Sequence, residues 1–291
     1  MSIEDIILAQ DKRGISALRS HLPPDYCMQT ARFILDHSGS VLIATGFSIP
    51  MAQATETDGP LGALAIGSAL TALGQRVAYI TDRETTSLLA HLAGPDTEII
   101  DFPITDAVSS RQYAADVLAQ LNPALLIAIE RCGLTQSDTY LNMRGRDISA
   151  TTARIDELFF QHAHTVGIGD GGNEIGMGNL AAYIPSVDSL PDQPTTTCTT
   201  HLIIASVANW GAYGLVTALS SLTGRNLLPD PQAERDLIRQ AVDAGAVDGT
   251  TASRTYTVDG FDLEANAAVL EQLHRLLAQQ PDCRTERELN A

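Results

Sequence analysis

The sequence predicts an α/β protein of three layers, in which a mostly parallel sheet carries helices on both faces. Short β-branched or aliphatic runs alternate with longer helical patterns from residue 41 to residue 222. Right-handed crossovers make consecutive strands in such a pattern parallel. The run ALLIAI at 124–129 holds no polar residue, which is typical of a strand that is buried on both faces.

Each expected element follows from this alternation. The strands are expected at Val41–Thr45, Arg76–Thr81, Thr97–Asp101, Ala124–Ile129, Thr165–Gly169 and Leu202–Ala205. The helices between and after them are expected at Pro60–Leu73, Glu84–Leu92, Ala107–Leu121, Thr151–His162 and Asn209–Leu222. An N-terminal helix at about residues 4–22 and C-terminal helices within about 231–279 are expected to pack on this core, so residues 1–291 form a single α/β domain. The proline-rich segment Pro185–Thr200 is expected to be a long surface loop, either a lid or a plain insertion.

Composition removes several classes of function. The 18 basic and 35 acidic residues give a formal charge of −17, which repels nucleic acid. No apolar run is long enough to span a membrane. Lys12 is the only lysine, which argues against a Schiff base or a P-loop. The four cysteines have no C-x-x-C spacing, and the acidic N-terminal stretch has no apolar signal core, so we expect a cytoplasmic protein with reduced thiols.

The first candidate site follows the strand at 41–45. In a parallel sheet, ligands bind beyond the carboxyl ends of the strands. Here the long loop that begins with Thr45 and Gly46 ends in Asp58 and Gly59, just before a proline-initiated helix. The N–H groups of the turn from Leu61 to Leu64 are suited to an anion, and the small residues permit a close approach by a ligand. Alternatively, Asp58 merely caps its helix.

The second candidate site is the glycine-rich run GDGGNEIG at 169–176. It places Asp170, Asn173 and Glu174 beside Gly171 and Gly172. Two carboxylates this close in a buried loop are suited to proton transfer or to binding Mg²⁺. The match of this run to G-x-G-x-x-G is a weak indication of a dinucleotide site, because no acidic residue completes the fingerprint.

The third candidate site follows the strand at 124–129. Glu130 and Arg131 leave a buried strand, where a charge must be paired or bind a ligand. Further on, Asn142 and Arg144 are expected to contact a substrate, and the guanidinium suits a carboxylate. The alternative is an internal ion-pair cluster of Glu130, Asp147 and the arginines. Asn209 marks a fourth strand-to-helix turn, next to Trp210, which is expected in the core, and His162 and His164 are treated as structural.

Three long motifs carry a resemblance to a known family. They are T-G-F-x-I-P with E-T-D-G-P-x-G at 45–62, I-E-R-x-G with Y-L-N-M-R-G-x-D-I-S at 129–149, and G-I-G-D-G-G-N-E-I-G-M-G-N at 167–179. With these motifs the sequence resembles the D-glutamate cyclase family. The resemblance implies conversion of D-glutamate to 5-oxo-D-proline and water. It carries no assignment of catalytic residues. Ala252 departs from the pattern, since glycine is expected after D-G-T-T at 248–251.

That reaction suits the candidate sites. The amine and the γ-carboxyl group belong to one molecule, so the enzyme needs no nucleophile of its own and must manage protons. Asp170 and Glu174 are expected to divide the acid and base roles, with Asp58 as a third catalytic carboxylate. Arg144 or Arg131 would hold the α-carboxylate. The N–H groups of residues 61–64, or of Gly171 and Gly172, would stabilise the oxyanion.

Two other functions stay open at this stage. One is a Mg²⁺-dependent hydrolase of a phosphorylated or nucleotide substrate, with Asp58, Asp170 and Glu174 as metal ligands. The other is a non-catalytic binding protein for a small acidic metabolite. For the cyclase, no cofactor is required and D-glutamate is the expected partner, and a homo-oligomer is left open.

Overall fold

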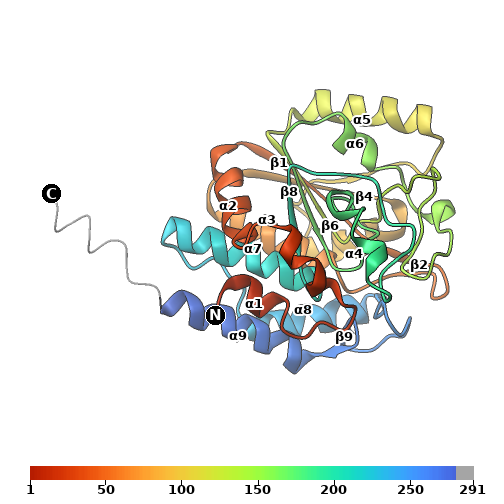
Figure 1. Cartoon of the computed structure of the whole chain (residues 1–291). Helices are drawn as coiled ribbons and strands as arrows, with labels where there is room; N and C mark the ends of the chain where they lie inside the picture. The colour runs from red at the N-terminus through yellow and green to blue at the C-terminus, as the bar shows by residue number, and fades with distance from the viewer. Residues whose placement is uncertain (280–291) are drawn as a thin grey trace.

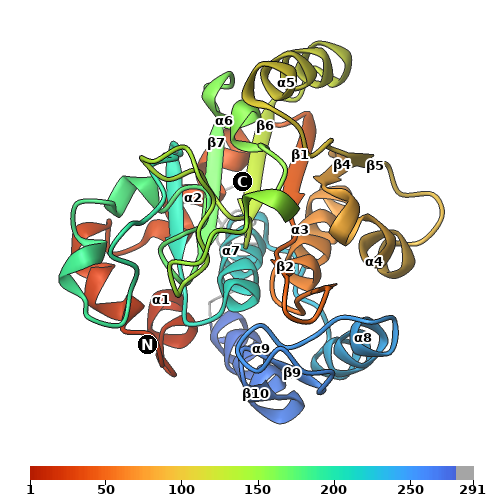
Figure 2. The same ribbon diagram turned by 90° about the vertical axis from the view of Figure 1, so that its right-hand side faces the viewer.

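A computed structural model describes residues 1–279 of the 291-residue chain. Its centre is a six-stranded sheet in the order β5-β4-β1-β6-β7-β8, and all five pairings are parallel (Figure 2). The strands are β1 (Ser40–Thr45), β4 (Arg76–Thr81), β5 (Ile99–Asp101), β6 (Leu125–Ile129), β7 (Thr165–Gly169) and β8 (His201–Ile204). The predicted fold class is confirmed, and each of the six predicted strands is present within two residues of its predicted ends.

Side chains of the central strands alternate between two hydrophobic cores. In β1, Val41 and Ile43 point into the larger core, whereas Leu42 and Ala44 point into the smaller one. Both faces of the sheet are therefore buried, which explains why the strands are apolar without interruption.

Helices cover both faces (Figure 1). One face carries α5 (Ala107–Leu121) and α6 (Asp156–Phe160), which close the smaller core. The other face carries α2 (Tyr26–Asp36), α3 (Pro60–Ala72) and α7 (Ala208–Thr223), with α4 (Arg83–Ala93) near the β5 edge. Beyond these lie α1 (Ile3–Ile7), α8 (Pro231–Asp243) and α9 (Leu263–Ala278), so the three-layer core has an added outer layer on this side. The predicted C-terminal helices are thus present.

Short elements complete the described chain. They are the hairpins β2 (Ser48–Ile49) with β3 (Ala54–Thr55) and β9 (Thr257–Val258) with β10 (Phe261–Asp262), and the 3₁₀ helices η1 (Ile15–His21), η2 (Ser149–Thr151), η3 (Gly178–Leu180) and η4 (Ile184–Ser186).

Two helical predictions differ from the structure, and one helix was missed. The single helix expected at about residues 4–22 is split into α1 and η1, because the Asp11 carboxylate accepts the N–H of Gly14 at 2.7 Å and Gly14 has φ +80°. The helix expected at Thr151–His162 is reduced to η2 and the five residues of α6. Helix α2 was not predicted, although Pro23 and Pro24 precede it in the chain.

The sheet reverses its order at one point. Beginning with β1, the chain adds β4 and β5 on one side, and then crosses to add β6, β7 and β8 on the other. The loops that follow β1 and β6 therefore diverge, and such a switch point leaves a crevice where ligands bind in open α/β sheets.

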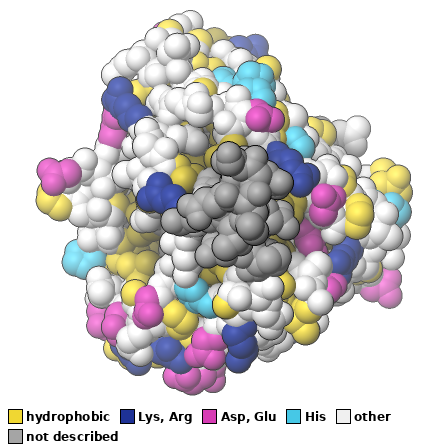
Figure 3. Space-filling view, turned by 90° about the vertical axis from the view of Figure 1, so that its left-hand side faces the viewer, with side chains coloured by type: hydrophobic (Ala, Val, Ile, Leu, Met, Phe, Trp, Pro, Cys, Tyr) yellow, Lys and Arg dark blue, Asp and Glu magenta, His cyan; other side chains and the backbone are white. Residues whose placement is uncertain are grey.

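The outer surface carries charges of both signs. On the face that Figure 3 shows, acidic, basic and histidine side chains lie among hydrophobic ones. Among the described residues, no helix has the length and apolar character needed to cross a membrane. The cytoplasmic location stays a prediction, and a homo-oligomer stays open.

Candidate active site

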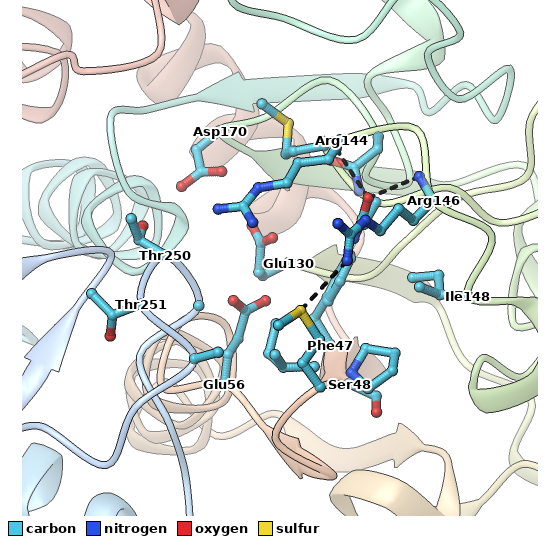
Figure 4. Close-up of a pocket in the computed structure, with 18 of the residues that line it drawn as sticks. Phe47, Ser48, Glu56, Glu130, Arg144, Arg146, Ile148, Asp170, Thr250 and Thr251 are labelled. Atoms are coloured by element: carbon cyan, nitrogen blue, oxygen red, sulfur yellow. Dashed lines mark hydrogen bonds between the residues drawn. The ribbon is translucent and has the colours of Figure 1, made fainter.

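A cavity of about 480 Å³ lies at the switch point of the sheet (Figure 4). Its walls come from the loops after β1, β6 and β7, from the C-terminal loop at 249–252, and from the turn before η1. The lining residues are Arg13, Phe47, Ser48, Ile49, Pro50, Met51, Glu56, Glu130, Asn142, Met143, Arg144, Arg146, Asp147, Ile148, Asp170, Asn173, Gly249, Thr250, Thr251 and Ala252. Segments from five parts of the chain thus meet around one space.

Buried carboxylates occupy the inner half of this cavity. Glu56, Glu130 and Asp170 line it, and Figure 4 shows their carboxylates directed toward the same space. Asp170 also has further carboxylates behind it. Oxygen atoms of Asp58, Asp170 and Asp259 lie within 4.8 Å of one another, as do oxygen atoms of Glu130, Asp170 and Glu174.

This crowding changes the proton affinity of the cluster. Burial raises the pKa of Glu130 well above its ordinary value, and the charges of Asp170 and Glu174 add to the rise. Burial, with Asp259 and Asp58, raises the pKa of Glu56 in the same way. Burial also raises the pKa of Asp170, although the Arg13 guanidinium opposes this rise. The cavity therefore holds carboxyl groups that keep a proton at higher pH than ordinary carboxyl groups do.

The backbone at Glu130 is strained. This residue has φ +42°, and its Oε2 atom is buried without a hydrogen-bond partner among the described residues. Gly59 permits the arrangement: its φ is +93°, and a Cβ atom there would lie 2.7 Å from the Glu130 Cβ. A strained, unsatisfied acid that lines a cavity is characteristic of a functional position.

Glu174, one of the predicted catalytic residues, does not line the cavity. Its carboxylate accepts the N–H of Gly171 at 2.7 Å and that of Gly172 at 2.8 Å, so it closes its own loop. The expected oxyanion donors Gly171 and Gly172 therefore already have an acceptor. The loop is also paired with the chain after β6, because the N–H of Gly133 donates to the carbonyl of Asn173 at 2.7 Å. A direct catalytic role for Glu174 stays a prediction.

Asp58 caps a helix, but not the one that it precedes. It accepts the N–H groups of Ala208 and Asn209 at the start of α7. Asn209 in turn accepts the N–H of Gly62, one of the donors expected to face a ligand. Leu61 is fully buried in the larger core. The starts of α3 and α7 are therefore joined to each other behind the cavity.

The small residues at the end of β1 meet protein atoms rather than the cavity. The Gly46 carbonyl accepts a hydrogen bond from Arg131 at 3.0 Å. Thr45 is fully buried, and its Oγ1 atom lies 2.9 Å from the place that a Cβ at Gly59 would take. Thr45, Gly46 and Gly59 therefore do not line the cavity.

The arginines separate into two kinds. Arg131 is buried, and its guanidinium lies 2.6 Å from Asp82, so it joins the loops after β4 and β6 and does not line the cavity. Arg144 and Arg146 are exposed at the cavity and form no ion pair with any residue that the structure describes. The Asn142 side-chain oxygen accepts the backbone N–H of Arg144 and that of Arg146, each at 3.0 Å, and so orders the turn that carries both arginines. The expected alternative, an ion-pair cluster of Glu130 and Asp147 with these arginines, is not what forms.

Sequence reasoning missed four residues that matter here. Glu56 and Asp259 belong to the motifs E-T-D-G and T-V-D-G, so a signal for them was present. Thr250 belongs to D-G-T-T. Arg13 lies in no motif, and only the folded N-terminal segment brings it to the cavity. By contrast, the Pro185–Thr200 loop contributes no lining residue, which argues against a lid.

The fold and the site together define an α/β protein with an acid-lined small-molecule cavity at the switch point of its sheet. Residues 3–274 match the family model described as D-glutamate cyclase-like, C-terminal, and the chain belongs to this family. It is 32% identical over 210 residues to the mitochondrial D-glutamate cyclase of Homo sapiens, an alignment that covers 65% of this chain and 34% of that protein. The chain thus spans about a third of the length of this curated relative, which is an enzyme by its name.

Proposed function

We propose that this protein cyclises D-glutamate to 5-oxo-D-proline with release of water. The observation that carries the proposal is that one cavity is lined both by carboxyl groups with raised pKa values and by arginines that form no ion pair within residues 1–279. Glu130 and Asp170 line its inner part, and Arg144 lines its outer part. Membership of the family and the name of the human relative give the reaction its prior support.

In this reaction the substrate supplies both reacting groups. Its amine nitrogen forms a bond with the γ-carboxyl carbon, and one C–O bond of that carboxyl group breaks. Two protons pass from the ammonium nitrogen to the departing oxygen, which leaves as water. The protein must therefore accept protons at one position and deliver them at another.

Two lining carboxyl groups suit these two tasks. Asp170 forms an ion pair with Arg13, whose charge opposes the rise in pKa that burial causes, so of the two groups we assign Asp170 to accept protons from the ammonium group. Burial and the charges of Asp170 and Glu174 favour the protonated form of Glu130, so we assign it to deliver protons to the leaving oxygen. Glu174, which the sequence suggested for one of these tasks, would act through the shape of its loop.

The remaining groups would orient the substrate. Arg144 is placed to pair with the α-carboxylate through charge-assisted hydrogen bonds. Thr250 and Thr251 line the wall on the side of Glu56 (Figure 4). The Thr251 side chain is hydrogen-bonded to Asp248, so the Thr250 hydroxyl is the donor for the oxyanion in place of the occupied backbone N–H groups.

The test is incubation with D-glutamate and, separately, L-glutamate, followed by chiral chromatography of 5-oxoproline. We expect product from the D isomer. Asp170→Asn and Glu130→Gln should each lower kcat by about 100-fold or more. The control Glu271→Gln, at an exposed position of α9, should leave kcat unchanged, and melting temperatures check folding. Thermal stabilisation by D-glutamate without product would identify a binding protein instead.

A second candidate function rests on two clusters of three carboxylates, both of which include Asp170. Either group offers oxygen ligands to a hard cation such as Mg²⁺, so a metal-dependent hydrolase of a phosphorylated substrate is also proposed for testing. The sequence predicted Asp58, Asp170 and Glu174 as one set of metal ligands. In the structure Asp58 and Glu174 belong to different clusters. Turnover of D-glutamate that survives exhaustive chelation would favour the cyclase. Strict Mg²⁺ dependence with a phosphate ester would favour the hydrolase.

A further inference from the structure

Arg13 is in direct contact with the buried carboxylates of the cavity. Its guanidinium forms an ion pair with Asp170 and lies 2.8 Å from Asp259. Apart from the contact with Arg13, neither oxygen of Asp170 has a hydrogen-bond partner among the described residues. The orientation of the Asp170 carboxylate thus depends on this one arginine.

The turn that carries Arg13 is held in place by neighbours from distant parts of the chain. Asp11 accepts the N–H of Arg13 at 2.9 Å, and Ser189 donates to the Arg13 carbonyl at 2.5 Å. The adjacent Lys12 donates to the carbonyl of Gly260 at 3.1 Å and lies 3.3 Å from the centre of the Phe261 ring. Arg13 is therefore built into the wall of the cavity at a fixed point.

The charges around Asp170 explain why an arginine is needed there. Asp58, Asp259 and Glu174 raise the pKa of Asp170 together with burial, and the charge of Arg13 is the influence that lowers it. Without the guanidinium, Asp170 would face like charges in a desolvated space with no partner among the described residues to fix its orientation.

We propose that Arg13 is a positioning residue for the cyclisation, because its guanidinium fixes the Asp170 carboxylate in place to accept protons from the substrate ammonium group. This inference rests on the proposed function. Arg13 acts through Asp170 and not on the substrate, so its removal impairs turnover more than binding.

The first experiment requires no turnover. The side-chain carboxyl carbons of aspartate are labelled with ¹³C, the Asp170 signal is assigned with Asp170→Asn, and its titration is followed by NMR in the wild type and in Arg13→Gln. We expect the midpoint for Asp170 to rise by about one pH unit or more in Arg13→Gln. The matched control is Arg19→Gln, which removes an exposed partner of Asp5 at 2.7 Å. An unchanged midpoint in Arg13→Gln overturns the proposal.

The second experiment measures kcat and KM across pH. Arg13→Ala should lower kcat by about tenfold or more with KM nearly unchanged, and added guanidinium ion should restore part of kcat. Arg13→Lys, which keeps the charge, should lie between wild type and Arg13→Ala and serves as the test if Arg13→Ala fails to fold. A rise in KM with unchanged kcat, or unchanged kinetics, overturns the proposal. If the wild type forms no 5-oxoproline, the proposed function fails, while the NMR titration still decides whether Arg13 controls Asp170.

Discussion

Asp58 caps the helix that carries Asn209, and Asn209 in turn caps the helix that follows Asp58. The Asp58 carboxylate accepts the N–H of Ala208 at 2.9 Å and that of Asn209 at 2.8 Å, in the first turn of α7. The Asn209 side-chain oxygen accepts the N–H of Gly59 at 3.0 Å and that of Gly62 at 2.7 Å, in the first turn of α3. The exchange joins the helices that follow β1 and β8 and fixes the floor behind the carboxylate cluster.

This exchange predicts a large loss of stability when Asn209 is shortened. Asn209→Ala leaves the N–H of Gly62 buried without its acceptor and the carbonyl of Thr57 without its side-chain donor, while the N–H of Gly59 keeps the Asp58 carboxylate as an acceptor. Each unsatisfied group costs about 1–3 kcal/mol, so we expect the free energy of unfolding to fall by about 2–4 kcal/mol in a urea titration. Asp230→Ala is the control, because Asp230 is an exposed cap of α8 and its loss costs about 1 kcal/mol. Equal losses in the two variants would contradict the buried exchange.

Arg131 and Arg144 should respond to substitution in opposite ways. Arg131→Met leaves Asp82 as an uncompensated buried charge, and we expect it to lower the free energy of unfolding by about 3–5 kcal/mol. Arg144→Ala removes an exposed side chain, so stability should change by no more than about 0.5 kcal/mol. If Arg144 binds the α-carboxylate, KM for D-glutamate should rise by about tenfold or more. Unfolding curves and steady-state kinetics on both variants check this contrast.

These two arginines also show where sequence reasoning stops. Both follow the strand at 125–129, and both were candidates for binding a carboxylate. Only the packing decides between them, since Arg131 is covered by the Gly46 carbonyl and the Asp82 carboxylate whereas Arg144 stays exposed at the cavity. The strands, by contrast, were predictable because apolar runs such as LLIAI are dictated by burial on both faces, a local property of the sequence.

The carboxylate cluster was predictable only in part for a similar reason. Asp170 was identified because its own loop is unusual, and Glu130 because a charge directly after a buried strand demands a partner. Arg13 carries no such local signal, since its role arises from Asp11 and Ser189 fixing its turn beside β7. Asp58 was misleading in another way, because a cap of a helix that lies 150 residues away in the chain cannot be read from its neighbours.

Burial of Glu234 predicts that stability depends on pH. Glu234 lies in α8, where the Tyr213 hydroxyl donates to its carboxyl group, and burial raises the pKa of Glu234 to about 7. In the unfolded chain its pKa is about 4.3, so the folded state holds the extra proton between these two values. The contribution of Glu234 to the free energy of unfolding is therefore fully present below pH 4. It falls by about 1.4 kcal/mol per pH unit up to pH 7, above which it is lost.

Glu234→Gln isolates this contribution. Glutamine does not ionise, so we expect the melting temperature of the variant to fall less steeply than that of the wild type between pH 5 and pH 7. The cavity acids Glu56, Glu130 and Asp170, whose pKa values are also raised, give both proteins a remaining slope of the same sign. Glu271→Gln, on the exposed side of α9, should reproduce the wild-type profile. Identical profiles for Glu234→Gln and the wild type would show that Glu234 titrates normally.

Ala252 occupies a backbone conformation that favours glycine. It has φ +53°, in the loop whose Asp248 side chain accepts the N–H groups of Thr250 and Thr251. In the folded state, a left-handed conformation costs a non-glycine residue about 1–2 kcal/mol. Replacing alanine with glycine removes that strain but lowers the free energy of unfolding by about 0.4–1 kcal/mol, because glycine gives the unfolded chain more freedom. Ala252→Gly should therefore raise the free energy of unfolding by about 0.5 kcal/mol. The control Ala115→Gly, inside α5, should lower it by about 1 kcal/mol. A comparable loss in both variants would mean that the loop does not impose this conformation on Ala252.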